Sequence, residues 1–169
     1  NGVTARLGLA AIGAPEAALT ASGVWDPTLT AVARGGLLTV FGRNIAAAAG
    51  GTTGLIGPRL PFALNGASVT IGGRMAPVLQ VNTDAVVAQV PVETALGAQP
   101  VVVTTPRGTA RTTATVAAAA PGIYFDDITR DGQRAAVYRV LGGAYTQITA
   151  TSPARPGDTL VFFGTGFGT

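Results

Sequence analysis

Short β-prone runs separated by glycine, proline and Asn-Gly pairs constrain the fold of this chain more than any other feature. The 169 residues include 24 glycines and 11 prolines. Helical periodicity is weak, and the only helix-like stretches, Pro15–Thr20 and Ile45–Ala49, are short and rich in alanine. Many short strands with frequent turn signals are typical of a β-sandwich. We therefore predict an all-β fold.

The predicted strands are apolar runs bounded by turn residues. Gly72-Gly73 and Gly142-Gly143 are two-residue hairpin signals, and Pro77 predicts an edge position or a bulge. Ala117–Gly122 predicts a junction between two modules. The predicted strands are Leu37–Phe41, Ser68–Ile71, Met75–Val81, Ala85–Val90, Gln99–Thr105, Thr109–Val116, Ile123–Phe125, Ala135–Val140, Tyr145–Thr149 and Thr159–Phe163.

The residue types that the chain lacks exclude several kinds of chemistry. There is no cysteine, no histidine and no lysine. Thiol nucleophiles and thiolate metal sites are therefore excluded, as are imidazole bases and histidine ligands. A lysine Schiff base and a Walker phosphate loop are excluded as well. We expect no enzymatic activity, no metal and no cofactor.

The charge pattern argues against nucleic acid as a partner. The formal net charge is +3, and the 11 basic residues, all arginine, are spread along the chain rather than clustered as in nucleic-acid-binding proteins. No segment reaches the roughly 18 apolar residues of a membrane helix, so we expect no membrane span. Low charge with abundant threonine and glycine favours a secreted protein, extracellular or at the cell surface.

One segment of the sequence is repeated. Ala33–Gly42 (ARGGLLTVFG) is similar to Ala154–Gly164 (ARPGDTLVFFG) at an offset of 121 residues, with one residue inserted before the closing glycine. Each copy has a basic turn, an apolar strand and a glycine. The repeat predicts two related modules; the alternative is chance likeness between two strands that follow glycine turns.

Four short motifs follow one another between Gly36 and Val116: FGRN (Phe41–Asn44), SVTIGGRMAPV (Ser68–Val78), AVVAQVP (Ala85–Pro91) and GAQPVVVTTPRGTA (Gly97–Ala110). In this order they resemble the IPT/TIG family of immunoglobulin-like domains. The wider chain, with AAAAPGIY and ARPGDTLVFFGTGFG, is similar to an uncharacterised C-terminal region of secreted proteins of Solibacter-type acidobacteria. The resemblance implies an immunoglobulin-like sandwich, an extracellular setting and no known catalytic residues.

Together these observations predict three parts. Residues 1–22 form an N-terminal β segment, residues 23–118 an IPT/TIG-like sandwich, and residues 119–169 a second β module that is incomplete or completed by another chain.

Several candidate sites have simpler structural interpretations. Gly164–Gly168 lacks the spacing of a dinucleotide loop and is interpreted as a turn. Asp126, Asp127 and Asp131 could supply oxygens to calcium, but their spacing is not that of an EF-hand loop. The carboxylates of Asp26, Asp84 and Glu93 could serve glycoside hydrolysis but are interpreted as solvated. An aromatic platform for sugar would use Trp25, Tyr124, Tyr138 and Tyr145, which are otherwise core or interface anchors.

Three apolar segments are candidates for contact with another chain. Asn1–Ile12 alternates like a strand without a partner, Gly50–Leu64 is a long apolar loop that folds back or docks on a neighbour, and Leu160–Phe163 is an apolar edge. The candidate interface residues are Val3, Ala5, Leu7, Leu9, Leu55, Ile56, Leu60, Phe62, Leu160 and Phe162.

Two functions remain open. In the first, Asn1–Ile12 completes the unfinished module of an adjacent copy and builds a head-to-tail filament by strand complementation. In the second, the chain is an immunoglobulin-like spacer or a carbohydrate-binding accessory module of a larger secreted protein.

Overall fold

A computed structural model describes residues 5–6, 18–20, 31–51, 59–123, 125–127, 134–135 and 137–168. Every regular element in these ranges is a β-strand, so the prediction of an all-β fold is confirmed. No helix in this described part has the length and apolar character needed to cross a bilayer.

The first sheet has the strand order β1-β2-β4-β10-β9-β5. Strand β4 lies between β2 and β10, and both pair with it antiparallel. The strands are β1 (Ala5–Arg6), β2 (Ala18–Thr20), β4 (Leu37–Phe41), β5 (Gly50–Gly51), β9 (Val78–Val81) and β10 (Ala85–Gln89).

The second sheet has the order β3-β12-β11-β7-β6, and β8 also pairs with β7. Strand β3 runs parallel to β12, whereas the other pairs are antiparallel. The strands are β3 (Val32–Ala33), β6 (Ala63–Leu64), β7 (Ala67–Ile71), β8 (Arg74–Ala76), β11 (Gly97–Thr105) and β12 (Gly108–Ala117).

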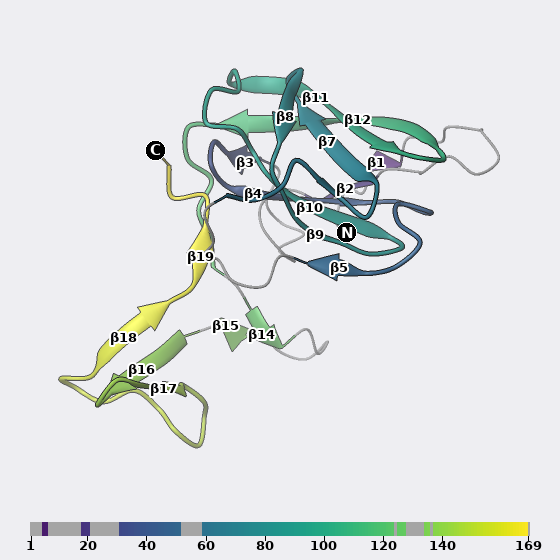
Figure 1. Cartoon of the computed structure of the whole chain (residues 1–169). Coiled ribbons are helices and arrows are strands. Elements are labelled where there is room, and N and C mark those ends of the chain that lie inside the picture. Colours follow the sequence, from purple (N-terminus) through teal and green to yellow (C-terminus); the bar gives the residue numbers. More distant parts are fainter. Residues whose placement is uncertain are drawn as a thin grey trace.

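The two sheets pack face to face around one core (Figure 1). Strand β12 shows the strict alternation that this packing requires: Ala110, Thr112, Ala114 and Val116 are buried, and the residues between them are exposed. Valine and alanine supply most of the core, and Leu38, Ile45 and Ile71 are its largest fully buried side chains. A core of such small residues lets the two sheets approach closely.

Pro77 divides the predicted strand Met75–Val81 between the two sheets. Strand β8 pairs with β7 across the Gly72-Gly73 turn, and β9 pairs with β10 in the other sheet. A register shift opposite Val87 and Ala88 forms a bulge beside the proline. Proline has no N–H for a ladder bond, and here it lies where the chain changes sheets.

The alanine-rich stretch Ile45–Ala49 is not helical; it follows β4 as a series of bends. Ile45 is fully buried in the core, and its N–H donates to the carbonyl of Thr83. Burial of this one side chain outweighs the helix preference of the alanines. In the other helix-like stretch, Ala18–Thr20 forms strand β2.

Residues after β12 form three small sheets, which lie to one side of the sandwich (Figure 1). The largest has the order β17-β16-β18, and we call it the C-terminal sheet. The strands are β13 (Gly122–Ile123), β14 (Phe125–Asp127), β15 (Arg134–Ala135), β16 (Val137–Leu141), β17 (Ala144–Gln147), β18 (Thr159–Phe162) and β19 (Gly164–Thr165).

Only Ala5–Arg6 of the predicted N-terminal strand Asn1–Ile12 lies in the described residues. It forms β1, which pairs with β2 of its own chain at the end of the first sheet. This short segment therefore has a partner within the chain.

Candidate interaction surface

The strand register assigns each side chain of the C-terminal sheet to one of two faces. Residues that lie opposite each other in an antiparallel pair point to the same face. Val137 pairs with Phe162 and Arg139 with Leu160, whereas Tyr138 pairs with Val161 and Val140 with Tyr145. The Phe162 face therefore comprises Val137, Arg139, Leu141, Ala144, Thr146, Leu160 and Phe162. The Tyr138 face comprises Tyr138, Val140, Tyr145, Gln147, Thr159, Val161 and Phe163.

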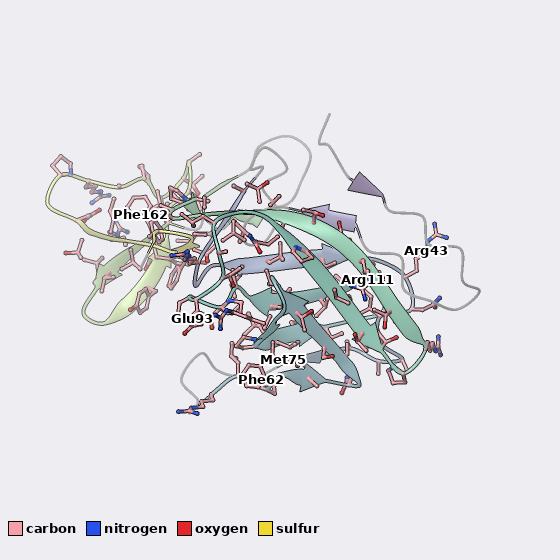
Figure 2. The ribbon with its side chains drawn as sticks, turned by 90° about the horizontal axis from the view of Figure 1, so that it is seen from above. Arg43, Phe62, Met75, Glu93, Arg111 and Phe162 are labelled. Carbon is pink, nitrogen blue, oxygen red and sulfur yellow. The ribbon has the colours of Figure 1, made fainter. Side chains whose placement is uncertain are left out.

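Both faces carry exposed apolar side chains beside polar ones. Leu141 and Phe162 are 55% and 54% exposed on one face, and Tyr145 is 62% exposed on the other. Figure 2 shows Phe162 on the protruding sheet, far from Phe62 and Met75 of the sandwich. An antiparallel sheet usually has one apolar face and one solvated face. Exposed apolar residues on both faces distinguish the C-terminal sheet from this usual arrangement.

The turn before β18 is fixed by one acidic side chain. Asp158 accepts a hydrogen bond from the Arg155 N–H at 2.8 Å and forms an ion pair with Arg139 at 3.4 Å. Both side chains of the ion pair are about 15% exposed, so Arg139 is neutralised within the Phe162 face. The Tyr138 and Phe163 rings meet edge to face at 5.5 Å on the opposite side.

The turns before β4 and β18 have the same backbone geometry, which places the inserted residue of the repeat earlier than the sequence comparison did. The turn before β4 has a Gly36 N–H bond to Ala33 O and a left-handed Gly35. The turn before β18 has an Asp158 N–H bond to Arg155 O and a left-handed Gly157. The two turns correspond at an offset of 122, so Gly42 now coincides with Gly164 without an insertion.

The same offset extends past the two strands. Asn44 has φ of 58°, and Gly166, which lies 122 residues later, has φ of 78°. Ile45 then corresponds to Phe167. The equivalent segments therefore run from Ala33 to Ile45 and from Arg155 to Phe167, with left-handed residues at both shared positions.

Equivalent core positions differ sharply in burial between the two copies. Val40 and Ile45 are 0% and 1% exposed, whereas their counterparts Phe162 and Phe167 are 54% and 64% exposed. Burying one phenylalanine side chain contributes about 1.5–3 kcal/mol. The side chains that form the core of the first copy thus lie uncovered in the second.

The segment Gly164–Gly168 packs against the end of the first sandwich. Thr165 is buried, and its Oγ1 accepts a hydrogen bond from the Leu37 N–H at 3.1 Å. The Ala120 N–H donates to Gly166 O at 2.9 Å, and β19 pairs with β13. The glycine-rich motif therefore lies at the junction as strand β19 followed by an irregular segment, and its interpretation as a turn is wrong.

The candidate interface residues fall into separate groups. Leu160 is half-buried and Phe162 exposed on the Phe162 face, and Phe62 is exposed on the sandwich. Leu60 is half-buried, and the nearby Pro61 O accepts a bond from Val78 N–H. The side chains of Val3, Ala5, Leu7, Leu9, Leu55 and Ile56 lie outside the described residues.

Two exposed residues were absent from the sequence-based candidates. Leu141 and Phe167 lie in or beside the C-terminal sheet. Aligning Ile45 with Phe167 in the repeat would have identified the last of them.

The acidic candidates do not form a described site. Asp84 and Glu93 flank opposite ends of β10, whose five residues span roughly 16 Å, whereas glycosidase carboxylates lie about 5–9.5 Å apart. Within the described ranges no group of three potential metal-ligating side chains occurs. Asp26 and Asp131 lie outside those ranges, as do Trp25 and Tyr124 of the aromatic candidates.

A shallow depression of about 230 Å³ lies on the first sheet beside Thr39, Phe41, Gln80, Asn82 and Asp84. Among the described residues that line it, Asp84 is the single ionisable group, so these residues offer no acid–base pair.

Comparisons with known proteins provide no family. No family model matches the chain, and no curated protein matches it. A solved structure from Bacteroides thetaiotaomicron, described as "Putative phosphatase", is similar at 19% identity and a TM-score of 0.36. The match covers 68% of this chain and 22% of that chain. The chain thus spans less than a quarter of that protein, and a likeness this weak carries no argument.

Proposed function

We propose that the chain is a non-enzymatic extracellular structural or adhesive protein built from immunoglobulin-like units of the IPT/TIG type. In this proposal the first unit is complete, and Asn1–Ile12 of an adjacent copy exchanges the pairing of Ala5–Arg6 with β2 for a pairing with the second unit, which it completes. Successive copies then join head to tail in a surface filament. The uncovered core positions Phe162 and Phe167 carry the proposal, because their counterparts in the first unit are fully buried.

The composition of the chain supports assembly through backbone ladders and apolar contacts. Charged residues make up only 11% of the sequence, which leaves few groups for electrostatic recognition. A strand added to an exposed edge gains affinity from main-chain hydrogen bonds and specificity from alternate side chains. The absence of cysteine, histidine and lysine supports a role without catalysis.

Size measurements on the full chain and on a variant lacking Asn1–Ile12 test the proposal. The full chain should form concentration-dependent oligomers in sedimentation velocity and regular filaments in electron microscopy. The variant should stay monomeric. It should assemble again when a second copy that carries Asn1–Ile12 as a fused peptide is added. A full chain that remains monomeric at every accessible concentration contradicts the filament proposal.

The repeat also favours a second function, that of a spacer in a larger secreted protein. Tandem modules related by a fixed offset are typical of such arrays. A carbohydrate platform has less support. Of its four aromatic candidates only Tyr138 and Tyr145 lie in the described residues, and the Tyr138 ring packs edge to face against Phe163. A monomeric full chain in the sedimentation test would favour the spacer.

A further inference from the structure

Strand β18 has a neighbour on one side only within the described residues. The order of the C-terminal sheet is β17-β16-β18, so β18 lies at its end. Its counterpart β4 has neighbours on both sides, β2 and β10. The side of β4 that corresponds to the free edge of β18 follows from the direction of the backbone hydrogen bonds.

In an antiparallel sheet, alternate residues of a strand direct their N–H and C=O groups to opposite neighbours. The Gly42 N–H donates to Asp84 O, and the Val90 N–H donates to Gly36 O. These two bonds continue the ladder between β4 and β10. Even-numbered residues such as Leu38 and Val40 therefore face β10, and odd-numbered residues face β2.

The same argument applies to the C-terminal sheet. The Ile148 N–H donates to Val137 O, so the odd-numbered residues of β16 face β17 and the even-numbered ones face β18. Tyr138 pairs with Val161, and the odd-numbered residues of β18 therefore face β16. The backbone groups of Leu160 and Phe162 point to the free edge. Because these residues correspond to Leu38 and Val40, the free edge is the position that β10 occupies in the first unit.

We infer that the free edge of β18 is an acceptor site for one antiparallel strand in the β10 position. The occupant is an extended apolar segment with the side-chain pattern of β10, in which Val86, Ala88 and Val90 are fully buried. Since Val86 lies opposite Val40 and Ala88 opposite Leu38, equivalent small apolar residues would cover Phe162 and Leu160. This inference rests on the proposed function and specifies its acceptor side.

A disulfide test can detect both binding and register. Gln89 lies opposite Leu37, and these two residues form a pair without hydrogen bonds between their backbones. The counterpart of Leu37 in β18 is Thr159, so the Gln89 position of a bound strand would lie opposite Thr159. Such pairs have Cα atoms about 4.5 Å apart, within the range that a disulfide spans. The chain has no cysteine, so Thr159→Cys, at an exposed position, would carry the only thiol of the full chain.

The probe is a synthetic peptide with the sequence Ala85–Pro91, flanked by arginines for solubility and carrying Gln89→Cys. Under a glutathione redox buffer it should form the disulfide with Thr159→Cys roughly tenfold faster than the same peptide carrying Ala88→Cys, which places the thiol on the other face. Val161→Cys with Val87→Cys provides a second in-register pair. Equal rates for the in-register and off-register peptides, or no disulfide with either pair, would overturn the inference.

A parallel reaction separates this inference from the filament proposal. A peptide with the sequence Asn1–Ile12, carrying a cysteine at successive positions, is offered to the same Thr159→Cys chain. If the β10 peptide reacts in register and the Asn1–Ile12 peptide does not react, the acceptor site is supported and strand exchange through the N-terminal segment fails. If only the Asn1–Ile12 peptide reacts, the β10 register assigned to the site is wrong.

Discussion

Gly164 lies where the strand leaving the C-terminal sheet meets the backbone leaving the first sandwich. A Cβ atom at this position would lie 2.6 Å from Gly122 O and 2.8 Å from a Phe167 ring carbon. A Cβ at Gly166 would collide with the carbonyl of Ala120. These two glycines are therefore required by the close approach of two backbones, which no single-sequence pattern reveals.

The first prediction concerns this contact. Gly164→Ala should open the junction and lower the free energy of unfolding by about 1–3 kcal/mol, as overpacking does. Gly51→Ala is the matched control, because its Cβ would lie 4.0 Å from the nearest atoms and neither glycine has a left-handed φ. Urea denaturation measures the stability, and hydrogen exchange at the Ala120 amide reports the junction bond to Gly166. Equal stability of the two variants would show that the junction tolerates a methyl group.

At the scale of strands, the sequence predicts where strands and turns occur better than it predicts which strands pair with each other. The Gly72-Gly73 and Gly142-Gly143 hairpins form as predicted, with positive φ at both glycines of each pair. That result follows from local chemistry, because such turns need left-handed residues. The change of sheet at Pro77 depends on packing between distant strands. The helix-like alanines after Ile45 fail as a prediction for the same reason.

The repeat of β4 and β18 gives the second prediction, at equivalent positions of the two strands. Val40→Thr places an unpaired hydroxyl in a fully buried site and should cost about 1–3 kcal/mol. Phe162→Thr changes a half-exposed side chain and should alter monomer stability by about 0.5 kcal/mol or less, while weakening any oligomer. Thermal unfolding and sedimentation measure the two effects. A large loss of monomer stability in Phe162→Thr would show that this face is already covered within one chain.

At the scale of the whole molecule, the described residues form one closed core between two sheets and one small sheet with exposed apolar residues on both faces. The sequence predicts two modules because its turn and strand motif occurs twice. It does not reveal that, among the described residues, the second copy has a strand in the β2 position and none in the β10 position. That distinction depends on which neighbouring strand the N–H and C=O groups of alternate residues face. The register of both sheets determines this direction. The interface residues predicted at Leu160 and Phe162 lie at the free edge of β18.

The last prediction concerns how stability is divided across the molecule. Val101 and Val103 lie in β11, which is bonded on both sides within the complete core, so their amides should exchange only through global unfolding. Tyr138 and Val140 lie in the middle of a three-stranded sheet whose faces are incompletely covered. Their amides should exchange about 100-fold faster after correction for intrinsic rates, a difference of about 2.8 kcal/mol.

Native-state hydrogen exchange monitored by NMR measures both sets of amides in one sample. Adding the Ala85–Pro91 peptide should slow exchange at Tyr138 and Val140 and leave Val101 and Val103 unchanged, because the occupied edge stabilises only the C-terminal sheet. Equal protection of the two sets without peptide would mean that the molecule unfolds as one cooperative unit. The C-terminal sheet would then owe its stability to the junction at Thr165 and Gly166, and the open edge would not limit it.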